Sequence, residues 1–152
     1  MEEQSASFLA MRKKACKPGS KKIVVVLDFG GNIVVGREHE ELDGSYFCRG
    51  WCSIVGVAVW VDGVKLNKPI HYDVLSPCLD HSSFAAHIAL SKVLDDMWAE
   101  GTIVGGEELD VWSDNGGHFA AAVFAGACLA AIPKKYGFTR ASWNGPAQQM
   151  KR

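Results

Sequence analysis

The sequence predicts an α/β domain built on a mixed five-stranded sheet, with the element order β-β-β-α-β-α-β. Three observations support this fold class. The run Ile23–Leu27 is continuous and mostly β-branched, which is typical of a strand buried on both faces. Asp62-Gly63 is a strong hairpin signal between two extended apolar runs. Two apolar segments of helical length follow later, and each precedes a short segment that is typical of a strand.

The first half of the chain predicts a three-stranded antiparallel meander. Its first strand ends at Asp28, and Gly30-Gly31-Asn32 then allow a tight turn before a short extension of the strand. The acidic residues 38–44 are expected to form a loop. The three strands of the meander are residues 23–27, 50–61 and 64–75.

The second half predicts two helices and two strands. Capping residues around Ser82 precede a helix whose apolar residues recur on one face, and Gly101 is expected to end it. The Ala-rich run 118–132 is expected to form a buried helix that Pro133 ends. The remaining strands are residues 109–112 and 138–143.

Composition indicates one globular domain in a reducing compartment. The chain has 152 residues, of which 48% are hydrophobic and 22% are charged. Five cysteines without a spaced framework favour an intracellular setting without disulfides. We expect no membrane span and no signal peptide. The expected parts are a basic, loosely ordered leader (1–20), the domain itself (21–145) and a short basic tail (146–152).

Charge is distributed unevenly although the formal net charge is only −1. Residues 1–22 carry six basic side chains, and residues 23–113 carry five basic against fourteen acidic side chains. Five basic residues and no acidic residue follow Asp114. Basic ends of this kind fit a polyanionic partner such as nucleic acid. An ordinary solvated surface is the alternative.

Two aspartates define the candidate site. Asp28 ends the first strand and Asp114 ends the fourth, 86 residues later. Right-handed crossovers can place the fourth strand parallel beside the first, so that these two ends adjoin. Neighbouring carboxylates repel each other unless a cation lies between them, and Mg²⁺ prefers such oxygen ligands. Alternatively, Asp28 is a turn residue and Asp114 caps the following helix.

The motifs around these aspartates resemble those of a known superfamily. LDFGGN ends the first strand, and WSDNGGHF contains the pattern S-D-x-G-x-x-F. With the element order, these motifs resemble the ribonuclease H-like fold and, within it, DDE-type transposases and retroviral-type integrases. Together with YDVLSPCLDHSSF, they are similar to transposon-derived open reading frames of eukaryotes. The likeness covers about residues 23–143.

The resemblance implies that Asp28 and Asp114 are catalytic carboxylates that bind Mg²⁺ or Mn²⁺. The family takes a third acid from a helix after the fifth strand, whereas no Asp or Glu follows Asp114 here. Either the chain is a fragment or degenerate copy, truncated before that last helix, or Asp80 or His118 completes the site. The alternatives are that Asp80 begins its helix and that His118 is a surface or capping residue.

The resemblance also implies a function on DNA. We expect divalent-metal-dependent phosphodiester cleavage or strand transfer, with nuclear localisation for a eukaryotic transposase, and an oligomer is compatible with this function. Lys134, Lys135 and Arg140 are candidates for phosphate contacts, or else ordinary surface residues. Because only two of three acids are present, enzymatic activity stays open. The alternatives are an inactive module that binds nucleic acid or protein, and a ribonuclease H-type nuclease on RNA–DNA hybrids.

Overall fold

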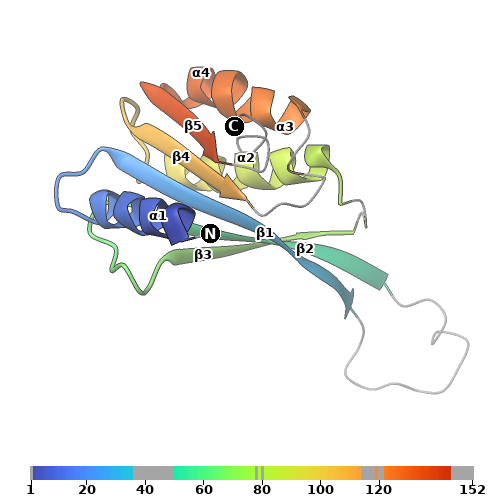
Figure 1. The fold of residues 1–152 in the computed structure, drawn as a ribbon. Coiled ribbons are helices and arrows are strands. Elements are labelled where there is room, and N and C mark those ends of the chain that lie inside the picture. The colour runs from blue at the N-terminus through green and yellow to red at the C-terminus, as the bar shows by residue number, and fades with distance from the viewer. Residues whose placement is uncertain are drawn as a thin grey trace, which may run out of the picture.

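The described part of the chain forms an α/β fold around one mixed sheet with strand order β3-β2-β1-β4-β5 (Figure 1). The computed structural model describes residues 2–35, 50–77, 79, 81–113, 119 and 122–144. The strands are β1 (Lys22–Val35), β2 (Gly50–Trp60), β3 (Ile70–Ser76), β4 (Glu108–Ser113) and β5 (Arg140–Asn144). The first three are antiparallel neighbours, while β4 runs parallel to β1 and β5 parallel to β4. The five-stranded mixed sheet and the parallel pairing of the first and fourth strands confirm the sequence prediction.

Helices cover both sides of the sheet, which explains why β1 is apolar on both faces. Helix α1 (Glu2–Ala15) lies on one side, and α2 (Ser83–Ala99) lies on the other (Figure 1). Val25 and Leu27 belong to the large core that includes α2, whereas Val24 packs in a smaller cluster on the α1 side. We call these two sides of the sheet the α2 face and the α1 face.

Helix α2 begins at a side-chain cap, as its sequence predicts. The Ser82 Oγ accepts a hydrogen bond from the backbone N–H of Ala85 at 3.3 Å. Its apolar stripe is buried against the sheet, and Gly101, at φ +75°, follows the C-terminal end. The buried residues of the stripe are Ala86, Ala89, Leu90, Val93, Leu94 and Met97.

Replacing Ser82 with alanine is expected to destabilise the domain by about 1 kcal/mol, because the Ala85 N–H loses its acceptor at the helix N-terminus. Equilibrium unfolding in urea measures this loss. The neighbouring Ser83→Ala variant is the control and should differ from the parent by less than about 0.5 kcal/mol. Equal losses in both variants would contradict the cap.

Residues 2–15 form a helix, so the expectation of a loosely ordered leader over residues 1–20 is wrong for this stretch. The Phe8 ring lies 4.9 Å from the ring of Trp112 and 6.0 Å from that of Trp60. One helical turn later, the Arg12 guanidinium lies over the Trp60 ring at 5.0 Å. The helix is therefore held by tertiary contacts. A local pattern of polar and basic residues does not predict such contacts.

The first strand does not turn at the glycine pair, as the sequence suggested it could. Instead β1 continues to Val35 and pairs with β2 from Val24 onward, with a shift of register between Phe29 and Gly31. Gly31 adopts φ +87°, which a residue with a side chain rarely adopts. The two strands extend beyond the rest of the sheet as a long ribbon (Figure 1).

The connection from β2 to β3 contains the expected tight turn at Asp62-Gly63. The Val64 N–H donates to the carbonyl of Val61 at 3.2 Å, and Gly63 has φ +77°. However, the third strand begins at Ile70 rather than at Val64. Between the turn and β3, Lys65 and Lys68 form an isolated antiparallel bridge outside the sheet.

The Ala-rich segment continues past Pro133, so the prediction that this proline ends the helix is wrong. Its described part consists of α3 (Ala122–Gly126), a π-helical turn (Ala127–Ala131) and α4 (Ile132–Tyr136). Proline lacks the N–H that an α-helix needs in its interior. Here the π-helical turn precedes it, so that Pro133 falls in the first turn of α4, where no donor is needed. Gly137 ends the helix at φ +69°.

Candidate functional site

Asp28 lies on β1 with its side chain exposed, one residue past the part that pairs with β4. It faces Gly56 on β2, and Gly56 in turn faces Asp73 on β3. A Cβ at Gly56 would lie 3.8 Å from the Asp28 carbonyl oxygen and 4.0 Å from Asp73 Oδ1. Both are ordinary van der Waals distances, so the surface at Gly56 is bordered by the backbone of Asp28 and the side chain of Asp73.

The α1 helix covers a different part of the same face. Strand alternation places Asp28 on the α1 face with Val24, and Val24 packs in the cluster of Phe8, Trp60 and Trp112. Asp28 lies four residues further along β1, which is about 13 Å at the usual rise of a strand. The contacts of α1 are thus centred away from Asp28.

The register of β1 and β4 relates the two predicted aspartates. Parallel pairing runs from Lys22 beside Glu108 to Leu27 beside Ser113. In the sequence, Asp28 directly follows Leu27, and Asp114 directly follows Ser113. Asp114 itself lies outside the described residues, as do Asp80 and His118.

An aromatic cluster lies on the other face of β1, directly after Asp28. The Phe29 ring stacks on His81 at 4.7 Å between centroids and lies 5.4 Å from Phe119. The Nε2 of His81 lies 3.0 Å from the Asn32 Oδ1, so the Nε2–H tautomer donates to this amide oxygen. These contacts hold the segments before α2 and before α3 against the same part of β1.

Sequence reasoning missed this cluster and had no signal for it. His81 and Asn32 are 49 residues apart, and no spacing pattern links a lone histidine to a lone asparagine. The sequence predicts a turn at Asn32, whereas this residue lies within β1 after the register shift. A β-bulge next to a candidate site is a common way of redirecting side chains, but it was not predicted here.

The three predicted phosphate-binding residues lie at the opposite end of the sheet. Arg140 pairs with Glu108 at the start of β4, whereas Ser113 ends that strand five residues later. This separation corresponds to about 17 Å along the strand. Lys134 and Lys135 belong to the last turn of α4, shortly before β5. The structure therefore does not bring these three residues together with Asp28.

Lys135 already has an anionic partner in the structure. Its Nζ lies 2.7 Å from Asp95 Oδ1, and the Tyr136 hydroxyl donates to the same oxygen at 2.8 Å. These hydrogen bonds from Lys135 and Tyr136 lower the pKa of Asp95. A phosphate contact would have to compete with Asp95 for Lys135, whereas Lys134 and Arg140 are exposed. Trp143 of β5, three residues after Arg140, is only 7% exposed and belongs to the core.

Comparisons with known proteins give no family for this chain. No protein-family model matches it, and no curated protein matches it in sequence. Within the described ranges, no group of three or more His, Cys, Asp or Glu side chains could hold a metal ion. None of the described helices is long and apolar enough to cross a membrane.

Proposed function

We propose that this chain is a ribonuclease H-like domain of the DDE transposase type. Its two carboxylates, Asp28 and Asp114, would bind Mg²⁺ or Mn²⁺ and act on phosphodiesters of DNA. The single observation that carries the proposal is the parallel register of β1 and β4. It ends with Leu27 beside Ser113, so the two aspartates follow the ends of neighbouring parallel paired segments. Ligands of α/β sheets commonly bind at such carboxyl ends.

The chemistry follows from the charge of the pair. Two carboxylates at adjacent strand ends repel each other, and a divalent cation relieves that repulsion. When bound, such ions stabilise the attacking and leaving oxygens of an in-line phosphoryl displacement. The residues themselves would hold the ions and orient the phosphate.

A third ligand would have to come from the segments next to β1. Phe29 contacts His81, the neighbour of Asp80, and also contacts Phe119, the neighbour of His118. In the sequence, Asp80 directly precedes His81, and His118 directly precedes Phe119. This supports Asp80 and His118 as the candidates for completing the site.

The test is calorimetric titration of the full chain with MnCl₂ and MgCl₂. Asp28→Asn is expected to weaken binding by at least about tenfold, because an amide carries no charge to bind the cation. Asp114→Asn should have the same effect. Asp73→Asn is the matched control, since Asp73 is an exposed aspartate in the same row of the sheet, two strands away from Asp28.

Two results would contradict the proposal. One is the absence of saturable binding by the parent chain, and the other is an Asp28→Asn variant that binds as tightly as the parent. Metal binding without cleavage of labelled DNA would instead favour an inactive binding module of the same fold.

A further inference from the structure

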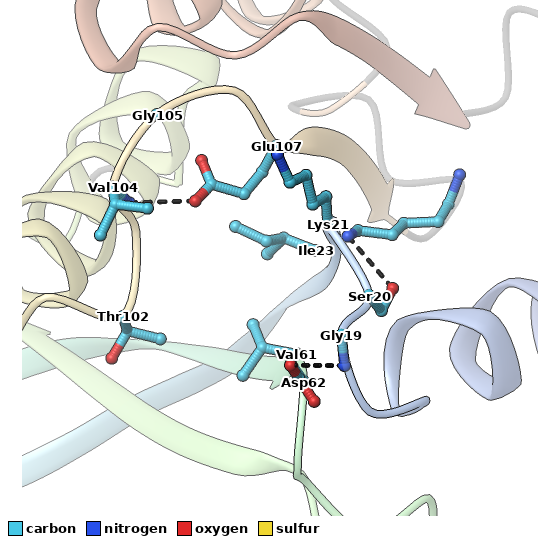
Figure 2. A pocket seen from close by; sticks show the side chains of 11 residues that line it. Gly19, Ser20, Lys21, Ile23, Val61, Asp62, Thr102, Val104, Gly105 and Glu107 are labelled. Carbon is cyan, nitrogen blue, oxygen red and sulfur yellow. Dashed lines mark hydrogen bonds between the residues drawn. The ribbon is translucent and has the colours of Figure 1, made fainter.

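A cavity of about 540 Å³ opens at the end of the sheet opposite to Asp28 (Figure 2). Three segments enclose it: the link from α1 into β1, the end of β2 with its turn, and the loop between α2 and β4. Lys22 marks this end of β1, six residues before Asp28, which corresponds to about 20 Å. The cavity is thus separate from the proposed DNA site. Its volume is in the range of small-molecule sites.

Glu107 is the one described charged side chain of this cavity that is more than nine-tenths buried. It is only 8% exposed, and its Oε1 accepts a hydrogen bond from the Val104 N–H at 3.0 Å. Its Oε2 is buried and has no hydrogen-bond partner among the described residues. Figure 2 shows the carboxylate extending toward Val104, above Ile23, within the ring of lining residues. A buried carboxylate oxygen without a donor is costly, so this position favours a cation in the adjoining cavity.

The nearest basic residues of the cavity leave Glu107 without a described ion pair. Lys22 also lines the cavity, but its Nζ is paired with Asp110 at 2.8 Å and with Glu108 at 3.3 Å. Lys21 is exposed. The charge of Glu107 is therefore available to a cation that enters the cavity.

The remaining lining combines polar acceptors with apolar walls. Asp62 contributes a second carboxylate, whose Oδ2 accepts from the Gly19 N–H at 2.9 Å, and Thr102 contributes a hydroxyl. Ile23 and Val61 are buried and form apolar walls. An ammonium group has three donors and needs acceptors of this kind, whereas a short hydrocarbon chain would pack on the walls.

We propose that this cavity binds a primary alkylammonium group, whose charge is compensated by the carboxylate of Glu107 and whose hydrocarbon chain packs on Ile23 and Val61. Such a group occurs in free amines and in the side chain of lysine. The proposal does not depend on the proposed function at Asp28, because the residues involved lie at the other end of the sheet.

The test is a titration of the ¹⁵N-labelled full chain followed by amide chemical shifts. The probes are n-butylammonium, 1,4-diaminobutane and Nα-acetyl-lysine amide, with butyrate as the anionic control. A saturable shift at Gly19, Val61 and Gly105 is expected with a dissociation constant of roughly millimolar size, as for any ligand of a few heavy atoms. Butyrate should cause no saturable shift there. A response to the free amines alone indicates a free amine as the ligand. A response to the lysine amide as well indicates that the cavity also accepts a lysine side chain.

Two substitutions make the test specific. Glu107→Gln keeps the shape and the Oε1 acceptor but replaces Oε2 with a donor, so binding should weaken by at least about tenfold. Lys21→Met removes an exposed cation from the lining of the cavity and should strengthen binding. Saturable shifts that map elsewhere on the parent chain, or no shifts at all, would overturn the proposal even if the Glu107 variant failed to fold. Unchanged affinity in a folded Glu107→Gln variant would do the same.

Discussion

Replacing Lys22 with methionine is expected to destabilise the domain by about 3–5 kcal/mol, because it leaves a buried carboxylate without its cation. The Lys22 Nζ lies 2.8 Å from Asp110 Oδ2, and Asp110 is only 5% exposed in the middle of β4. Oδ2 makes no other hydrogen bond with a described residue, so the charge of Lys22 is what compensates it. Denaturation in urea measures the loss, and the melting temperature should fall by about 10 °C.

The double variant Lys22→Met/Asp110→Asn separates the ion pair from simple packing. Asparagine removes the unpaired charge but keeps an acceptor for the Ser142 hydroxyl, which donates to Asp110 Oδ1. Most of the lost stability should therefore return in the double variant. The exposed neighbour Lys21→Met should change stability by less than about 0.5 kcal/mol. A double variant as unstable as Lys22→Met would contradict this account.

The pH dependence of the same pair has a defined sign. Burial lowers the pKa of Lys22, but the hydrogen bond and charge of Asp110, together with Glu108, outweigh it and raise the pKa above 10.5. The ammonium thus contributes its stability fully below the pKa of the unfolded chain. That contribution is lost as pH rises through the higher pKa of the folded state. The difference in stability between the parent and Lys22→Met should therefore shrink above about pH 10.5.

The strand pattern of this protein could be predicted because its signals are local. The continuous apolar run of β1, the Asp62-Gly63 turn and the cap at Ser82 each specify an element within a few residues. The parallel pairing of β1 and β4 then follows from the general handedness of crossovers. Asp28 directly follows the last residue of β1 that pairs with β4, so its position could be predicted from the same strand pattern.

The features that the sequence did not predict depend on contacts between distant residues. The helix α1 is polar along most of its length, and it is held by Phe8 against Trp60 and Trp112, more than fifty residues away. The π-helical turn before Pro133 is a similar case, because a proline read locally only predicts the end of a helix. Tertiary packing decides both, and a single sequence does not show it.

The same distinction applies to the two candidate sites. Asp28 ends a recognisable strand segment, so its role could be proposed from pattern alone. The His81–Asn32 contact and the cavity at Glu107 each combine segments that are far apart in the sequence. Whole strands and helices separate these segments. Glu107 in particular has the sequence context of an ordinary surface acid before a strand, and only the fold shows that it is buried.

Replacing Phe124 with alanine is expected to cost about 3–5 kcal/mol, because this side chain joins the C-terminal helical segment to the sheet. Phe124 is fully buried in α3. Its ring lies edge-on to Phe119 at 5.5 Å and to Trp143 of β5 at 6.5 Å. Truncation leaves a cavity between these two rings and removes both aromatic contacts. Thermal unfolding followed by circular dichroism measures the loss.

Two further variants test whether packing is the cause. Phe124→Leu retains most of the buried volume and should lose less than about 1.5 kcal/mol. Val123 is the adjacent residue but is 64% exposed, so Val123→Ala should stay within about 0.5 kcal/mol of the parent. Because Phe119 also contacts Phe29, next to Asp28, the same packing supports the proposed metal site. A small loss in Phe124→Ala, equal to that in Val123→Ala, would mean that the helical segment does not pack on the sheet through this ring.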